Sequence, residues 1–482
     1  MLDLAMKAID AAIGAGASYA DVRIINSKHE VLQTKDQDIS GINLSESIGM
    51  GIRALYKGGW GFASTQFLRP KDITEAALRA VELAKASASF MSKPLNLAPE
   101  PRYRATWISP HLIDPFTVSL EDKFAVLLRC AKTMLAVKGV SFCSGEMTFT
   151  KEKKFFVSSE GSEIDQTFIR SSCGIEANAF SVDERQRRSY PNSFGGQHEN
   201  GGWEIISKWN LEGNAQRIAE EAVQLLSAEQ CPQGTADVII GASQIALQIH
   251  ESCGHPTELD RALGHEANFA GTSFLTPNML GNLKYGSAIV TIVADATACS
   301  ALGGFGFDDE GVAAQCIPLV QNGVFSGYLS SRDTAQAVGL ERSGGCMRAA
   351  SWDRQPIIRM TNISLLPGTG GSLEDMIADT DSGILMETNK SWSIDDKRYN
   401  FQFGMEAGYE IKNGKITRLL KNPSYGGITP EFWNACDSIG GAKDYVEWGV
   451  PNCGKGQPMQ SMWTGHGAAP ARFRQIQIGM AR

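Results

Sequence analysis

The sequence predicts an α+β fold with two domains: an α/β amino-terminal domain over residues 1–231 and a β-rich, antiparallel carboxy-terminal domain over residues 232–482. Three observations support this prediction. The 482 residues exceed what one hydrophobic core usually supports. The segment "QCPQGTADVIIG" carries Pro and Gly and marks a boundary near Pro232. Helix and strand patterns alternate before this segment, whereas short strand patterns dominate after it.

The amino-terminal half contains both helical periodicity and β-rich runs. Ser119 and Asp122 resemble a capping box at a helix start, and Gly58-Gly59 suits the turn of a hairpin. The expected elements, in order, are a helix starting at Leu2, a strand within 19–40, a hairpin over 51–65, helices over 72–90 and 119–137, a hairpin pair over 153–180 and a helix over 214–229.

The carboxy-terminal half opens with a strand over 235–241 and a helix over 242–255. Later hairpins are expected at Asn322-Gly323 and Asn413-Gly414, because Asn-Gly readily takes positive φ at both central positions of a tight turn. The second half is therefore predicted to be a β-rich domain that carries one histidine-bearing helix.

Composition excludes several classes of protein. With 45 basic and 53 acidic side chains the formal net charge is −8, and no basic stripe indicates direct nucleic-acid binding. The ten cysteines are scattered without a C-x-x-C pair, as in a reduced cytosolic protein. No uninterrupted apolar run approaches membrane-spanning length. We expect a cytoplasmic protein with no membrane and no nucleic-acid partner.

The strongest chemical signal is "LQIHESCGHPTELDRA", which starts at Leu247 and contains His250, Glu251 and His255. In a regular helix, residues five apart differ by about 140° in direction, so two such imidazoles would splay. A π-type turn would bring them to one side, and Gly254 is a residue type that tolerates such a distortion. The other interpretation is a capped helix end with a histidine bonded to a carbonyl.

A catalytic zinc needs three protein ligands and one open position. Glu258 and Asp260 are close in sequence and would complete a set of two histidines and a carboxylate. Cys453, in the distant loop "GVPNCGKGQPM", is another candidate, although a lone cysteine is more often a small buried apolar residue. Spacing alone leaves the third ligand open.

Three motifs in order resemble the TldD/PmbA family of metallopeptidases: HExxxH with "HPTELD", "GGFGFDDEG" followed by "GVFSGYL", and "CGKGQP". The similarity runs over nearly the whole chain. It implies that His250, His255 and Cys453 bind zinc and that Glu251 is the catalytic glutamate. It also implies a TldD-like catalytic subunit, forming a homodimer or a heterodimer with an inactive family partner that lacks HExxxH.

The expected function is a zinc-dependent peptidase that hydrolyses short or unfolded peptides through a metal-bound water, with Glu251 as general base. An extended peptide substrate could add to a sheet edge. Lys455 and Gln457 are candidate oxyanion contacts, with surface solvation the expected fate of Lys455, and "GGFGFDDEG" is a candidate channel lining. His265 and His466 are expected to be surface or core histidines rather than ligands.

Two other functions remain open. The chain could be a non-catalytic, zinc-stabilised adaptor or regulator of a partner protein, which would show as a closed site with four protein ligands. It could also regulate a protein or nucleic-acid partner, although the acidic balance gives the nucleic-acid version little support. The sequence does not identify the physiological peptide, the cleavage preference or the substrate-binding residues.

Overall fold

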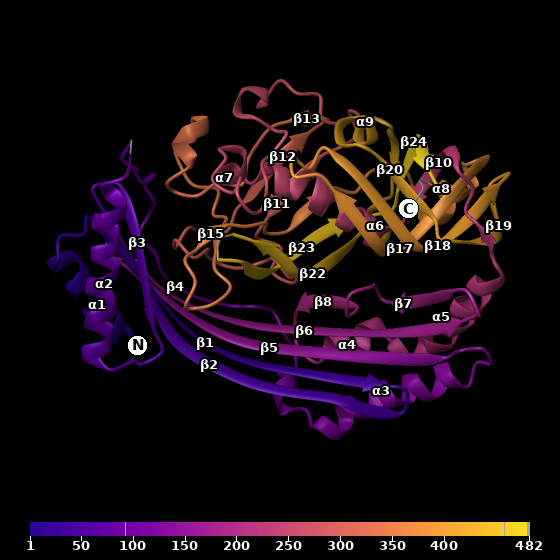
Figure 1. Cartoon of the computed structure of the whole chain (residues 1–482), viewed down its shortest axis with the longest axis horizontal. Helices are drawn as coiled ribbons and strands as arrows, with labels where there is room; N and C mark the ends of the chain where they lie inside the picture. Colours follow the sequence, from indigo (N-terminus) through magenta and orange to yellow (C-terminus); the bar gives the residue numbers. More distant parts are fainter. Residues whose placement is uncertain (92, 457, 480–482) are drawn as a thin grey trace.

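The computed structural model describes residues 1–91, 93–456 and 458–479. It has a mixed α/β, multi-domain architecture in which a long curved sheet lies beneath a second, β-rich body (Figure 1). Within the described residues, no helix is long and apolar enough to cross a membrane.

The first sheet is built from the amino-terminal part of the chain and has the order β3-β2-β1-β5-β6-β4, with β7 and β8 also paired to β6. Its pairs are antiparallel except for β4 with β6. The strands are β1 (Tyr19–Lys35), β2 (Asp38–Tyr56), β3 (Gly59–Thr65), β4 (Arg104–Ile108), β5 (Phe142–Ser158), β6 (Glu163–Phe180), β7 (Arg185–Tyr190) and β8 (Gln197–Asn200).

Two groups of helices cover this sheet at its two ends (Figure 1). Helices α1 and α2 pack on β1–β3, while α3 and α5 pack on β5 and β6, and each group encloses its own apolar core. The helices are α1 (Leu2–Gly14), α2 (Pro70–Ala88), α3 (Leu120–Leu135), α4 (Glu204–Trp209) and α5 (Leu211–Ser227). The Ser119 hydroxyl accepts a hydrogen bond from the Asp122 amide, so the predicted cap of α3 is confirmed.

The second sheet has the order β17-β10-β24-β20-β18-β19-β9, and an additional pairing of β17 with β18 closes five strands into a ring. Strand β21 pairs with β24. These strands are β9 (Glu229–Gln230), β10 (Gly234–Ile240), β17 (Ser382–Ile394), β18 (Asn400–Lys412), β19 (Lys415–Lys421), β20 (Ser424–Ile428), β21 (Cys436–Ile439) and β24 (Ala471–Ile478).

Smaller sheets and short helices complete the upper body. Its smaller sheets comprise β11 (Ile292–Asp295), β12 (Cys316–Gln321), β13 (Val324–Phe325) and β16 (Ile363–Leu365), the pair β14 (Met347–Arg348) and β15 (Ile357–Ile358), and the hairpin of β22 (Val446–Lys455) and β23 (Gln460–Ala468). Its helices are α6 (Ala242–Ile249), α7 (Leu259–Ala262), α8 (Leu373–Ala378) and α9 (Thr429–Asn434).

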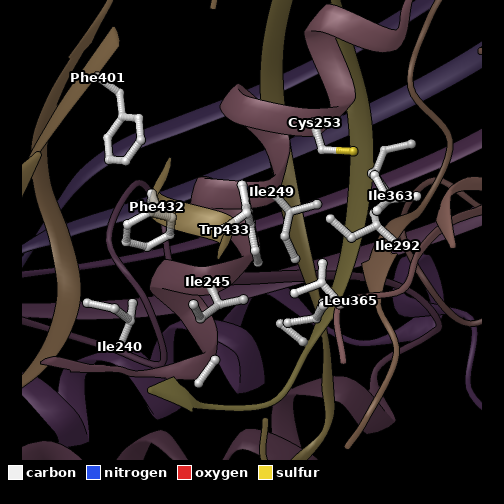
Figure 2. Packing of buried hydrophobic residues seen from close by; sticks show 14 of the residues in the cluster. Ile240, Ile245, Ile249, Cys253, Ile292, Ile363, Leu365, Phe401, Phe432 and Trp433 are labelled. Carbon is white, nitrogen blue, oxygen red and sulfur yellow. The ribbon is translucent and has the colours of Figure 1, made fainter. Parts of the chain in front are cut away.

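Helix α6 is anchored in the largest apolar core of the molecule. Ile245, Ile249 and Cys253 lie at four-residue spacing and belong to the same buried cluster as Ile292 and Leu365 (Figure 2). The apolar face is therefore packed inward over two turns. This packing fixes the orientation of the histidine segment that follows the helix.

Two details differ from the sequence-based expectations. The first hairpin turns at Lys57-Gly58, because Gly59 already pairs with Tyr56. The carboxy-terminal sheet is not wholly antiparallel, because β10 and β17 are parallel. The long chain segment between these two strands provides the crossover that parallel pairing requires. The turns at Asn322-Gly323 and Asn413-Gly414 are confirmed.

Candidate metal centre

The two motif histidines are brought together by a break in helix α6. Residues His250–Gly254 form a π-helical turn, and the His255 amide donates its hydrogen bond to the carbonyl of His250. This bond spans five residues instead of four, so side chains five apart face the same side. The imidazole centroids lie 4.9 Å apart with the rings nearly perpendicular. The π-type turn expected from the spacing is confirmed.

Gly254 is required for a reason other than backbone freedom. Its φ of −58° and ψ of −61° are ordinary helical values, which any residue can adopt. However, a Cβ at this position would lie 2.1 Å from Sδ of Met360. The glycine therefore permits close packing of Met360 against the π-turn, while the conformational tolerance expected of it is not used at these backbone angles.

Cys453 joins the two histidines from strand β22, almost two hundred residues further along the chain. One ligand atom from each of His250, His255 and Cys453 lies within 4.8 Å of the others, and all three residues are buried. The Sγ of Cys453 is 3.6 Å from Nε2 of His255. The register of β22 with β23 shifts between Val450 and Cys453. This irregularity lies immediately before the cysteine.

The two acidic candidates lie elsewhere in the local network. Oε2 of Glu258 is 3.0 Å from Nδ1 of His255, the nitrogen opposite the one that approaches Cys453. Asp260 is bound by Nζ of Lys455 at 2.7 and 2.9 Å. Lys455 is fully buried and also lies 3.5 Å from Glu258, so the expectation that it would be solvated at the surface was wrong. Gln457 lies outside the described residues.

His466, expected to be a surface or core histidine, is a core histidine that contacts this centre. It is fully buried on β23, and its Nε2 is 2.7 Å from Nδ1 of His250. Its Nδ1 is 3.1 Å from the carbonyl of Ile363. His265 is exposed, in agreement with its expected place at the surface.

Burial and nearby charges set the protonation of the three clustered side chains. Burial lowers the pKa of His250 to about 4 and that of His255 well below its ordinary value, so both rings are neutral near pH 7. For Cys453, burial acts to raise the pKa, but the nearby Arg359 and His255 outweigh it and the net pKa is lowered. By contrast, burial raises the pKa of Cys253 to about 12. Cys453 is therefore better suited to act as a thiolate.

Glu251 lies beside the histidines and faces a cation. Its Oε2 is 2.5 Å from Nη1 of Arg398, on the turn between β17 and β18, and the Nε of Arg398 has no hydrogen-bond partner among the described residues. Both residues line a cavity of about 280 Å³ together with the three clustered side chains. The remaining lining residues are Asn192, Ser193, Phe194, Ser243, Ala246, Leu247, Asn389, Trp392, Trp448, Gly449, Val450, Pro451, Asn452 and Gly454.

The "GGFGFDDEG" segment does not line this cavity. Among the described residues, Phe305, Phe307, Asp308 and Asp309 instead border a separate cavity of about 140 Å³ next to the first sheet. Glu310 is ion-paired with Arg53 of β2, at 3.2 Å. The segment connects the upper body to the first sheet, and its place in a substrate channel stays a prediction.

Sequence reasoning missed His466, Arg398 and the actual contacts of Glu258. A signal existed for Glu258, because His255 and Glu258 are three apart, a spacing at which side chains on a helix can meet. No local pattern connects His466 or Arg398 to the motif, since tertiary folding brings His466 from strand β23 and Arg398 from the distant β17–β18 turn.

Comparison with known proteins extends these observations over the whole chain. Models for domain 1, the central domain and the C-terminal domain of the PmbA/TldA metallopeptidases match residues 20–88, 113–228 and 233–479. A metalloprotease of Methanothermobacter thermautotrophicus is 31% identical over 461 residues, covering 96% of this chain and 95% of the relative. A metalloprotease of Methanocaldococcus jannaschii is 30% identical over 440 residues, covering 91% and 92%.

A "zinc metalloprotease TldD homolog" of Saccharolobus solfataricus is 23% identical over 446 residues, covering 91% of this chain and 92% of the relative. Among solved structures, a "putative modulator of a DNA gyrase" from Thermotoga maritima has a TM-score of 0.77 at 17% identity, covering 99% of this chain and 100% of that chain. TldE of Thermococcus kodakarensis has a TM-score of 0.73 at 16% identity, covering 99% and 100%. These structures share the fold, and the three matched domain models together show that the chain belongs to the PmbA/TldD family of metallopeptidases.

Proposed function

We propose that this chain is a zinc-dependent peptidase in which His250, His255 and Cys453 bind the metal and Glu251 is the general base. The observation that carries the proposal is the convergence of three buried ligand atoms within 4.8 Å of one another, in a cavity that Glu251 also lines. A relative named a zinc metalloprotease supports the choice of metal.

The donor set fits zinc well. Two neutral imidazoles and one thiolate are nitrogen and sulfur ligands of the kind that zinc prefers, and three protein ligands are typical of catalytic sites. The lowered pKa of Cys453 favours the thiolate form that metal binding needs. The cavity beside the cluster gives a water and a substrate access to the remaining position.

Bound zinc would polarise the scissile carbonyl and make a water more acidic. Glu251 would accept the proton of the attacking water and pass it to the leaving amine. Arg398 holds the carboxylate of Glu251 through Nη1, and this contact fixes the direction of the base. The guanidinium also faces the cavity, where its charge would favour the negative charge that develops on the carbonyl oxygen.

The cavity suits an extended peptide. Among the described strands, β22 pairs only with β23, and its residues Val450–Gly454 line the cavity. A substrate strand would add by main-chain hydrogen bonds, which require little sequence preference, along the second edge of β22 beyond Gly449. Before that point, Gln197 of β8 already bonds the Glu447 carbonyl and the Gly449 amide. Trp392 and Phe194, in edge-to-face contact at 5.5 Å, provide an apolar surface for one substrate side chain.

The adaptor interpretation receives less support from the geometry. A structural zinc site is closed by four protein ligands. Glu258 and Asp260 were the candidates for closing it, but Glu258 contacts His255 and Lys455, and Asp260 contacts Lys455. Both carboxylates thus have partners within the protein.

A second subunit of the family would find a strand edge on β2. Strand β3 pairs only with Met50–Tyr56 of β2, so the edge before Met50 has no partner strand among the described residues. Ile42 and Leu44 on this segment are 50% and 58% exposed. Exposed apolar strand edges favour pairing with another chain. We therefore infer a dimer through β2, with another copy or a TldE-like partner, which light scattering with Leu44→Lys would test.

Replacement of Glu251 by Gln tests the function directly. Because the amide keeps the shape of the side chain but cannot accept the proton, we expect peptide cleavage to fall by at least about 100-fold. Zinc content should be unchanged. The matched control is Glu431→Gln, an exposed glutamate on α9 outside the cavity lining. Cleavage by Glu251→Gln at the rate of the control would exclude Glu251 as the base.

A further inference from the structure

The two motif histidines are held by different partners. Nδ1 of His255 faces a carboxylate, Glu258, whereas Nδ1 of His250 faces another imidazole, His466. A carboxylate can only accept, so the proton position on His255 is fixed. For His250 the position depends on the state of His466, because an imidazole nitrogen can either donate or accept.

The surroundings of His466 determine that state. Its Nδ1 lies 3.1 Å from the carbonyl oxygen of Ile363, which can only accept, so Nδ1 carries a proton. In the neutral ring, Nε2 then presents a lone pair. The Thr464 hydroxyl, at 3.2 Å, can donate to it, and so can Nδ1 of His250 at 2.7 Å. The Ile363 carbonyl therefore determines which atom donates in each hydrogen bond of His466.

We propose that His466 is a positioning residue that holds His250 with its proton on Nδ1 and so keeps Nε2 of His250 free to bind the metal. The proposal rests on the zinc site of the proposed function and adds a role for a histidine outside the HExxxH motif. Partners of this kind fix the orientation and proton position of a metal-binding histidine.

The position of His466 in the fold gives this contact a second consequence. His466 lies on β23 and Cys453 on β22, so one hairpin carries both the third candidate ligand and the partner of the first. Cys453 pairs with Met462 in the ladder, four residues from His466. Packing of strands β22 and β23 against the π-turn therefore supplies both the third candidate ligand and the partner of His250.

A matched pair of variants tests the role of His466. In His466→Gln, the side-chain oxygen can accept from His250 near the place of Nε2, whereas His466→Met has similar size and no comparable acceptor. We expect His466→Met to weaken zinc binding by about 10–100-fold in competition with a chelator. His466→Gln should retain more of the affinity than His466→Met. Equal affinities of His466→Met and the unaltered protein would overturn the proposal, as would equal losses in both variants.

Thr464→Val serves as a control, because it removes the other donor to Nε2 and leaves the contact with His250 in place. Its zinc affinity should stay near that of the unaltered protein, and a loss as large as that of His466→Met would contradict the positioning role of His466. If the unaltered protein binds no zinc, the proposed function itself fails, which is a different result.

The proton position can also be measured without a substitution at His466. In the metal-free protein labelled with ¹⁵N-histidine, NMR should show a protonated Nδ1 and an unprotonated Nε2 for His250, assigned by comparison with His250→Gln. This readout needs neither activity nor a folded His466 variant. The opposite tautomer would overturn the proposal.

Discussion

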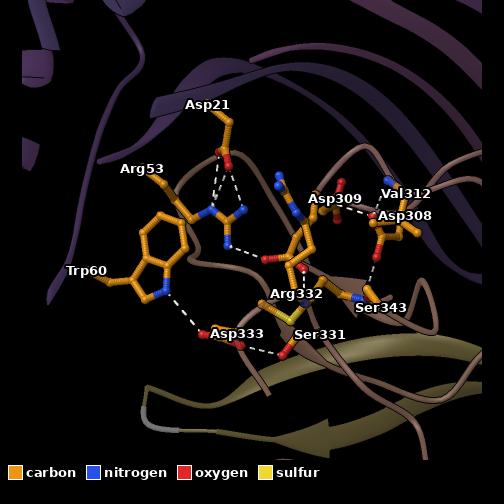
Figure 3. A network of polar contacts seen from close by, with 12 residues as sticks. Asp21, Arg53, Trp60, Asp308, Asp309, Val312, Ser331, Arg332, Asp333 and Ser343 are labelled. Carbon is orange, nitrogen blue, oxygen red and sulfur yellow. Dashed lines mark hydrogen bonds and ion pairs between the residues drawn. The ribbon is translucent and has the colours of Figure 1, made fainter. Parts of the chain in front are cut away.

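Two buried polar clusters in this molecule are built on opposite principles. Around Arg53 opposite charges meet: the guanidinium binds Asp21 at 2.5–3.1 Å (Figure 3) and Glu310 at 3.2 Å. At the candidate metal centre, two neutral imidazoles and a thiol with a lowered pKa converge instead. The first cluster pairs opposite charges within the protein, while the second brings three potential ligand atoms within 4.8 Å of one another.

The difference separates two kinds of buried polar cluster: one connects two parts of the fold, and the other could bind a ligand. The Arg53 cluster connects β1 and β2 to the 303–311 segment, since Asp21 and Arg53 come from the first sheet and Glu310 from the upper body. Asp308 stabilises the 303–311 segment by accepting hydrogen bonds from the backbone amides of Glu310 and Val312. Both clusters carried motifs that stood out in the sequence, but only the second gathers His and Cys side chains that could hold a metal ion.

Removing Arg53 should have the largest effect. Arg53→Met leaves Asp21 and Glu310 buried without their cation, which typically costs about 3–5 kcal/mol of folding free energy. Denaturant unfolding would measure the loss of folding free energy. Arg79→Met, on the exposed face of α2, serves as the control. Zinc affinity of the folded fraction should be unchanged. Unaltered unfolding would mean that the pairing adds nothing to stability.

Removing Cys453 should act on the metal rather than on the fold. Because loss of an outer partner alone costs about 10–100-fold in affinity, we expect Cys453→Ser to weaken zinc binding by more than about 100-fold. Cys253→Ala, at the buried thiol that packs in the core, should retain the metal and serves as the matched control. Unchanged zinc stoichiometry in Cys453→Ser would point to Glu258 or Asp260 as the third ligand.

The smallest effect is expected at Gly254, where neither charge nor ligation is involved. Gly254→Ala places a methyl group against Sδ of Met360, and overpacking of this kind costs about 1–3 kcal/mol. In thermal unfolding, Gly254→Ala should cost less in a Met360→Ala background than in the unaltered protein, because the shortened side chain leaves room for the added methyl group. An equal cost in both backgrounds would show that packing against Met360 does not require the glycine.

The sequence predicted local elements well because their signals are local. The Ser119 cap, the Asn-Gly hairpins and the π-turn each follow from residues within one or two turns of each other. It also predicted the three residues that the fold brings together. The choice of Cys453 came from a family resemblance, since nothing near Cys453 in the chain predicts its contact with His255.

The missed features depend on long-range packing. Lys455 appeared to be a surface residue until the fold placed it between Asp260 and Glu258, where two carboxylates compensate its burial. His466 and Arg398 reach the centre from β23 and from the β17–β18 turn. Spacing in the chain carries no information about such contacts, so only the folded structure identifies them.

X-ray absorption at the zinc edge of the purified protein tests the metal centre most directly. We expect one zinc per chain with one sulfur at about 2.3 Å and two histidine nitrogens at about 2.0–2.1 Å. The sulfur signal should disappear in Cys453→Ser. Zinc surrounded only by nitrogen and oxygen in the unaltered protein, or no bound zinc at all, would contradict the proposed centre.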